Sequence, residues 1–206
     1  MRKNRKEDIL KAAVDLFANN GFRGTTTRDL AARANVNEAI IFRYFKTKRD
    51  LYQAILDLKV SGEDREARFA EMQKLARVGD DRFFFESIGR NFLEEHKNDT
   101  TFLRLMLFSA LEGHEFVEMF LMSRADRNPL AQHIQQRIDE GAFRKVDPEL
   151  AAQAFFGMLV SFVIFHEIVA QKYNKAYEPD KVAANFASIF LLGTKLCPSS
   201  GDSSPV

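Results

Sequence analysis

Several residue types are scarce in this chain of 206 residues, and each scarcity argues against a class of protein. Cys197 is the only cysteine, so no disulfide can form within the chain, which is typical of the reducing cytosol. The longest uncharged stretch, Leu150 to Phe165, is shorter than the roughly 20 apolar residues that a bilayer requires. No signal peptide is visible either. We therefore expect a cytoplasmic protein that does not cross a membrane, with this stretch forming a buried helix.

Enzyme motifs are missing as well. The chain has no H-E-x-x-H zinc motif, no nucleophile elbow, no phosphate-binding glycine loop and no Cys/His pair with usable spacing. His114 and His166 stand near glutamates, but adjacent helical residues point in different directions, so we expect no metal site and no cofactor. The sequence therefore argues against an enzyme, and a cofactor-free helical enzyme is the least favoured alternative.

The net charge is only +1, but the charge is unevenly distributed. Residues 1–50 hold 12 Lys and Arg against 6 Asp and Glu, whereas the other residues hold 18 against 23. A basic head of net charge +6 on a remainder of net charge −5 is typical of a protein whose head meets phosphates. Phenylalanine occurs 20 times and tryptophan not at all, which predicts a core or cavity lined by phenyl rings.

Apolar residues recur at helical spacing through nearly the whole chain, which predicts an all-α fold of about nine helices. Short helices are expected over residues 6–19, 27–34 and 38–45, and Lys48 begins a fourth. Thr26 and Asp29 form a capping-box pattern before the second helix, and Asn37 can cap the third. Longer helices are expected over about 79–96, 100–111, 115–141 with a kink at Asn128-Pro129, 147–173 and 178–196.

This layout predicts two domains and a tail. The three short helices form a helix-turn-helix DNA-binding domain over residues 1–47. A larger helical domain for regulation and dimerisation follows over residues 48–197. Residues 198–206 are rich in Ser, Gly, Pro and Asp and are expected to be disordered.

Residues 21–51 read GFRGTTTRDLAARANVNEAIIFRYFKTKRDL. The glycine turn, the Thr-Thr-x-Arg-Asp-Leu-Ala start of the second helix and the Ala-x-Val-x turn closely resemble the signature of the TetR family. The aromatic end of the third helix and the following Lys-x-x-Leu resemble it too. The resemblance covers about residues 5–55. It implies a homodimeric repressor that binds a pseudo-palindrome in double-stranded DNA and that a small molecule releases.

The third helix of such a head lies in the major groove with its N-terminal residues at the base edges. Arg43 can donate twice to a guanine, and the small Ala39 lets the helix approach closely. Phosphate contacts are expected from the start of the second helix, from Tyr44 and from Lys48. The predicted DNA-binding residues are Thr26, Thr27, Arg28, Asn37, Glu38, Ala39, Phe42, Arg43, Tyr44 and Lys48.

Two of these residues depart from the family pattern. Phe42 stands where the resemblance leads us to expect Tyr, which removes one hydroxyl from the phosphate contacts. Glu38 places a carboxylate near the groove, where it could accept a hydrogen bond from a cytosine amino group.

The last two helices are apolar around most of their circumference, so each must be buried on more than one side. The family resemblance implies that two such helices from each protomer form a four-helix dimer interface. The alternative is that both are simply central core helices. The predicted interface residues are Ala154, Gly157, Ser161, Ala183, Phe186, Ala187 and Phe190.

The resemblance also implies a cavity for an effector inside the second domain. A wall of Phe and Met suits a small hydrophobic or aromatic molecule, with histidine or glutamate as polar anchors; ordinary core packing is the alternative. The candidate residues are Phe102, Met106, Phe108, Glu112, His114, Phe116, Phe120, Met122, Phe155, Phe162, Phe165 and His166.

Two further functions stay open at this point. The apolar last helices would also suit a helical adaptor that binds a different protein. An activator is compatible with the same residues, because repression is implied by the resemblance alone.

Overall fold

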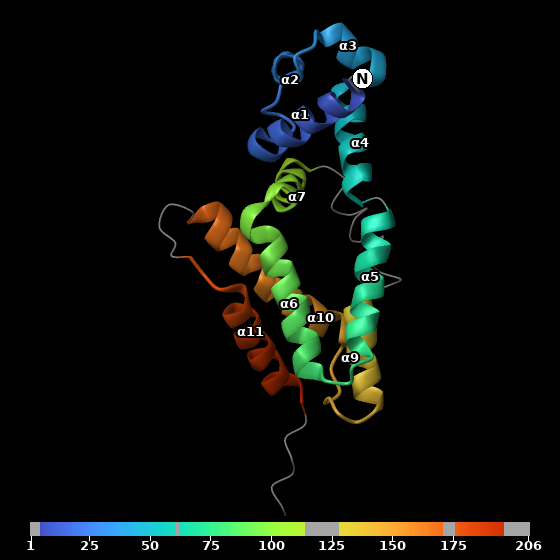
Figure 1. Ribbon diagram of the computed structural model, residues 1–206, viewed down its shortest axis with the longest axis vertical. Helices are drawn as coiled ribbons and strands as arrows, with labels where there is room; N and C mark the ends of the chain where they lie inside the picture. The colour runs from blue at the N-terminus through green and yellow to red at the C-terminus, as the bar shows by residue number, and fades with distance from the viewer. Residues whose placement is uncertain (1–4, 61, 114–127, 171–175, 196–206) are drawn as a thin grey trace, which may run out of the picture. The chain divides into compact units, whose positions relative to one another are not determined.

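The computed structural model describes residues 5–60, 62–113, 128–170 and 176–195 (Figure 1). This described part is helical apart from turns and one isolated bridge, which confirms the predicted all-α fold. The helices are α1 (Arg5–Asn20), α2 (Thr27–Ala34), α3 (Glu38–Tyr44), α4 (Lys48–Val60), α5 (Gly62–Ala76), α6 (Asp81–Asn98), α7 (Thr101–Glu112), α9 (Pro129–Asp139), α10 (Pro148–Val163), the π-helix η1 (Ile164–Val169) and α11 (Pro179–Thr194).

Helix α5 is not among the helices predicted from the sequence, and the other differences lie in the C-terminal half. The helix expected over 147–173 changes from α to π at Ile164. The helix expected over 115–141 is seen in its described part as α9, which begins at Pro129 with Asn128 as its cap. Residues 114–127 and the tail over 198–206 lie outside the described residues.

The chain divides into two compact units that do not follow chain order. The first unit consists of residues 1–67 and 99–126, and the second of residues 68–98 and 127–206. We call the first the head unit, which holds α1 to α4 and α7, and the second the body unit, which holds α6, α9, α10 and α11. The division into functional domains at residue 48 stays a prediction.

Phenyl rings fill the centre of the body unit. Phe85 of α6 is fully buried, and its ring centroid lies 4.9 Å from that of Phe155 and 4.7 Å from that of Phe190. Helices α6 and α11 pack closely, since a Cβ built on Gly89 would lie 3.2 Å from the Cβ of Ala183. The body unit therefore has a core of aromatic rings from α6, α10 and α11.

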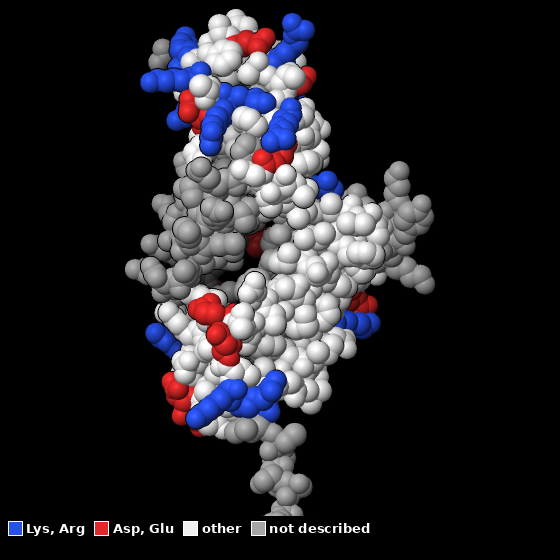
Figure 2. Space-filling view, turned by 180° about the vertical axis from the view of Figure 1, so that it is seen from behind, with Lys and Arg blue, Asp and Glu red and all other residues white. Residues whose placement is uncertain are grey.

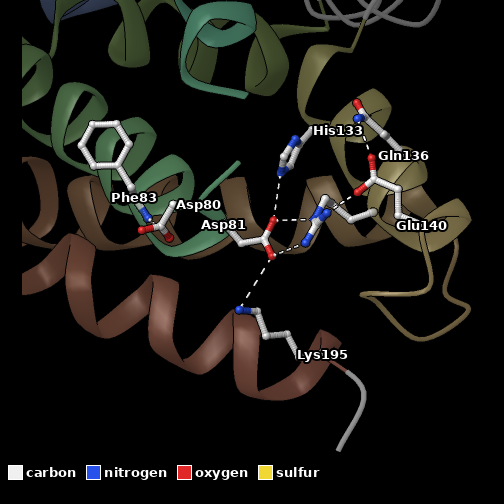
Figure 3. Close-up of polar contacts among 8 residues, drawn as sticks. Asp80, Asp81, Phe83, His133, Gln136, Glu140 and Lys195 are labelled. Atoms are coloured by element: carbon white, nitrogen blue, oxygen red, sulfur yellow. Dashed lines mark hydrogen bonds and ion pairs between the residues drawn. The ribbon is translucent and has the colours of Figure 1, made fainter. Parts of the chain in front are cut away.

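A buried carboxylate joins three parts of the body unit (Figure 3). Asp81, the first residue of α6, accepts hydrogen bonds from Arg137 of α9 at 2.8 and 3.2 Å. Nε2 of His133 and Nζ of Lys195 lie 3.3 and 3.7 Å from the same carboxylate. Burial lowers the pKa of His133, although Asp81 opposes this shift, so the net effect favours the neutral ring.

The apolar stretch that the sequence predicts to be a buried helix lies within the helix over residues 148–169, which is only partly buried within this chain. It passes a length and composition test for a membrane span, as the core helix of a soluble protein also can, but only 22% of its most apolar window is buried within this chain. Leu150 and Phe165 are 64% and 61% exposed. One face packs on the core of the body unit, and the opposite face is apolar and open, as is typical of a surface that meets a partner.

We predict that Asp81→Asn lowers the free energy of unfolding by about 3 kcal/mol, because it removes the charge that Arg137 and Lys195 share. Urea unfolding followed by circular dichroism measures this. The matched control is Glu94→Gln, which neutralises an exposed carboxylate on the same helix. If both variants unfolded at the urea concentration of the parent, the Asp81 cluster would not hold the body unit together.

Candidate functional site

Helices α2 and α3 have only 8 and 7 residues, too few for stable isolated helices, so side chains must fix their ends. The Thr26 hydroxyl accepts the Asp29 N–H at 3.1 Å, and the Asp29 carboxylate accepts the Thr26 N–H at 3.0 Å. The Asp29 carboxylate also accepts the Thr26 hydroxyl at 2.6 Å, and this bond, together with the one from the Thr26 N–H, holds the pKa of the Asp29 carboxyl below its ordinary value. Asn37 Oδ1 accepts the Ile40 N–H at 2.9 Å. Both caps predicted from the sequence are confirmed.

The angle between α2 and α3 is fixed by their turn and by the core beneath them. Asn35 takes the left-handed conformation, which asparagine adopts more readily than most residues, with φ of 54°. Leu30 and Ile41 are buried in one cluster with Phe17 of α1 and Leu51 of α4. This arrangement of capped helices on a shared core defines a helix-turn-helix head.

Helix α3 turns a face without core contacts to the solvent. Ala39 and Arg43 are exposed one helical turn apart, and Phe42 and Tyr44 are 44% and 39% exposed. The Arg43 guanidinium lies over the Tyr44 ring, 5.5 Å from its centroid. Figure 2 shows Lys and Arg side chains over this end of the head unit. Arg28 of α2, Lys46 after α3 and Arg49 of α4 are exposed.

A hydrogen bond across the two helices orients Glu38, the residue that departs from the family pattern. The Thr27 hydroxyl donates to Glu38 Oε2 at 2.5 Å. Because this bond uses the only hydroxyl proton of Thr27, a phosphate would have to be bound by another donor, such as the Thr27 backbone N–H. The bond also holds the Glu38 carboxylate at the first turn of α3.

Lys48 is held inside the head unit to a degree that the sequence did not predict. Its ammonium donates to the carbonyl oxygens of Phe22 at 2.7 Å and Thr25 at 2.8 Å, and it lies 4.1 Å from the centroid of the Phe22 ring. Burial lowers the pKa of Lys48, partly offset by Glu112. Two of its three N–H donors are thus used on the turn after α1, and a phosphate contact by Lys48 stays a prediction.

The predicted effector residues fall in both units. Phe102 and Met106 of α7 pack against the core cluster of the head unit, and Phe155 lies deep in the core of the body unit. Phe162 stacks on His166, with ring centroids 4.1 Å apart, whereas Phe165 is exposed. Phe108 and Glu112 lie against the turn after α1. The remaining four candidates, His114, Phe116, Phe120 and Met122, lie outside the described residues.

The predicted dimer residues on α11 pack largely within the protomer, and their place in a dimer interface stays a prediction. Ala183, Ala187 and Phe190 are buried within this chain, and Phe186 packs on Phe162, with ring centroids 5.7 Å apart. They face the protomer's own core because α6 and α10 cover that side of α11. The apolar side chains of α11 that remain open are Ile189, 59% exposed, and Leu192, 81% exposed.

The predicted dimer residues on α10 lie on its open face. Ala154, Gly157 and Ser161 are exposed, and a Cβ built on Gly157 would meet no atom within 4 Å. Their place in a dimer interface stays a prediction. The broad uncharged area on the right of Figure 2 lies on the side of the molecule that carries α10 and α11.

Two sequence profiles match the chain. The profile described as bacterial regulatory proteins of the tetR family matches residues 9–55, and that of the AefR-like transcriptional repressor C-terminal domain matches residues 86–193. The chain therefore belongs to the TetR family, whose members are DNA-binding transcriptional regulators and not enzymes.

Curated relatives resemble the chain most strongly in the head. An HTH-type transcriptional repressor of Mycobacterium tuberculosis is 53% identical over 49 residues, 24% of this chain and 26% of the repressor. The match thus spans about a quarter of that relative's length. The HTH-type transcriptional regulator YhgD of Bacillus subtilis is 26% identical over 165 residues, 78% of this chain and 83% of YhgD.

Solved structures share the fold along nearly the whole chain. FadR of Bacillus subtilis, in complex with stearoyl-CoA, has a TM-score of 0.64 at 19% identity, covering 91% of this chain and 98% of FadR. AibR, in complex with isovaleryl coenzyme A and operator DNA, has a TM-score of 0.67 at 20% identity, covering 90% of this chain and 97% of AibR. At these identities the likeness shows the fold alone.

We predict that Arg43→Ala reduces the preference for the best duplex over a mutated one by about 2 kcal/mol, because a bidentate contact to guanine is lost. Fluorescence anisotropy with both duplexes measures the difference. Lys145→Ala, which removes an exposed cation from the body unit, is the control for net charge. A parent-like preference in Arg43→Ala would mean that α3 does not read bases through this residue.

Proposed function

We propose that this chain is a dimeric, cytoplasmic transcriptional repressor that binds a pseudo-palindromic operator and is released from it by a small apolar effector. The exposed face of the capped helix α3 carries the proposal. Ala39 permits a close approach to the duplex, Arg43 supplies two parallel donors for a guanine, and Tyr44 supplies a hydroxyl for phosphate.

The basic surface of the head supports phosphate binding. Arg28, Arg43, Lys46 and Arg49 are exposed, and none of them forms an ion pair with another residue of the described part of the chain. Cations that are not neutralised by their own protein are available to replace the counterions of DNA. The positive end of α2, capped by Thr26, adds backbone N–H groups for a phosphate.

The open apolar face of α10 and α11 supports a homodimer. Leu150 of α10, Phe165 of η1 and Leu192 of α11 are exposed by more than half in one protomer. The small residues Ala154 and Gly157 between them would let a second helix approach closely. Burying such a face against a second copy releases ordered water and stabilises the pair. Two heads would then reach successive major grooves, about 34–36 Å apart.

A cluster of aromatic rings in the body unit supports the proposal that the effector is apolar. Phe162 packs on the rings of His166, Tyr177 and Phe186, with centroids 4.1, 4.9 and 5.7 Å apart. Burial and Glu167 raise the pKa of Tyr177 to about 12, which keeps its hydroxyl protonated as a donor. Because FadR and AibR of the same fold are bound to acyl-CoA molecules, stearoyl-CoA and isovaleryl-CoA are suitable first probes.

We predict that the purified protein selects, from random duplexes, two inverted half-sites whose centres lie about one helical turn apart. Its affinity for the selected duplex should fall roughly a thousandfold or more between about 50 and 200 mM salt, because phosphate contacts dominate binding. Selection followed by electrophoretic mobility shift at several salt concentrations tests both points. If no duplex were enriched, the DNA-binding function would be wrong, and an adaptor role for the apolar face would remain.

We predict that Leu192→Asp raises the dissociation constant of the dimer by more than about a hundredfold, because an unpaired carboxylate would be buried in the interface. Light scattering over a concentration series measures the dimer fraction. Val78→Asp places the same charge at a residue that is 60% exposed near the start of α6, and it should leave the dimer intact. Equal dimerisation of both variants would exclude α11 from the interface.

A further inference from the structure

The carboxylate of Glu112 binds a part of the head 90 residues away in sequence. Glu112 is the last residue of α7, and its Oε2 accepts the Phe22 backbone N–H at 2.9 Å. Its Oε1 accepts the Arg23 N–H at 3.0 Å. Both oxygens therefore cap the turn between α1 and α2, rather than pointing at an effector as the sequence analysis predicts.

The same turn is bound from its other side by α4. The Phe22 carbonyl and the Thr25 carbonyl both accept from the Lys48 ammonium. Phe22 thus donates its N–H to α7 and offers its carbonyl to α4, while its ring lies under the Lys48 ammonium. A charged group on each side makes these bonds stronger than bonds between neutral groups.

Glycine at position 21 is what allows α7 to approach the turn. Its φ of +71° is a conformation that other residues rarely adopt. A Cβ at this position would lie 2.7 Å from Glu112 Oε1 and 2.7 Å from Phe108 Cδ1. Both the backbone conformation and the missing side chain are therefore needed for the contact between α7 and the turn.

The turn between α1 and α2, which Glu112 and Lys48 bind, is followed directly in the chain by α2, part of the proposed DNA-binding surface. Thr25 is buried, its hydroxyl donates to the Gly21 carbonyl at 2.8 Å, and the next residue, Thr26, caps α2. A shift of α7 that moves Glu112 therefore moves the start of α2. Helix α7 also lies within the segment that matches the C-terminal repressor profile, although it packs in the head unit.

From these contacts we propose that Glu112 is the coupling residue between α7 and the DNA-binding surface, a role that rests on the proposed DNA-binding function. When Glu112 binds the backbone of the turn, α2 and α3 are held in the orientation that binds the duplex. When α7 moves away, the N–H groups of Phe22 and Arg23 lose their acceptor and the helix-turn-helix loses its fixed start. Coupling is reciprocal, so DNA that fixes the turn must also fix α7.

Hydrogen–deuterium exchange of the full chain, with and without the duplex selected above, tests this without knowledge of the effector. In the parent, the duplex should slow exchange of the α7 amides by about fivefold or more. In Glu112→Gln, which keeps the side-chain size, the slowing should fall below about twofold, because the NH2 group that replaces one carboxylate oxygen cannot accept the N–H that this oxygen binds in the parent. The Phe22 and Arg23 amides of this variant should exchange faster even without DNA.

Two further variants make the outcome decisive. Leu111→Ala changes an exposed neighbour on the same helix and should keep the full response. Gly21→Ala keeps the Glu112 carboxylate but adds a Cβ that would lie 2.7 Å from Glu112 Oε1, so it should lose the response. Melting temperatures verify that each variant is folded. A parent-like response of α7 in folded Glu112→Gln, or no response in the parent bound to DNA, overturns the coupling role and leaves the proposed function standing. Failure of the parent to bind any duplex overturns both.

Discussion

The fixed turn between α1 and α2 is the constraint on which the DNA-binding surface depends. Helices α2 and α3 are too short to be stable alone. They hold their places because Gly21 turns the chain back, Thr26 caps α2, and charged groups from α4 and α7 bind the backbone of the turn. With these ends fixed, Leu30 and Ile41 can share one core and leave the opposite face of α3 free.

The body unit is organised by a different interaction, the buried Asp81 carboxylate. It gathers cations from α9 and from the end of α11 around the first turn of α6. This fixes α6 and α11 against each other, and their contact turns Ala183, Ala187 and Phe190 inward. The side of α11 that remains apolar and open is the one that carries Ile189 and Leu192. Packing inside one protomer thus determines which apolar surface remains exposed and can bind a second protomer.

Local features of the head could be predicted from the sequence because each involves residues close in the chain. The capping box of Thr26 with Asp29 has a spacing of three residues and forms as expected, and Thr47 and Asp50 form the same pair of bonds at the start of α4. The cap at Asn37 and the exposed Arg43 follow from the same local pattern. The features that were missed are long-range. Nothing near Glu112 or Lys48 in sequence indicates that both bind the turn at Phe22. On α11, apolar residues surround the helix, so the sequence could not distinguish the core side from the open side.

The central claim, that α3 reads the major groove, is tested most directly by methylation interference on the selected operator. Dimethyl sulfate methylates guanine N7 in the major groove and adenine N3 in the minor groove. If α3 lies in the major groove, guanine methylation in each of two half-sites, about one helical turn apart, should prevent binding. Interference from adenine methylation alone, or no interference at all in a duplex that still binds, would contradict the account.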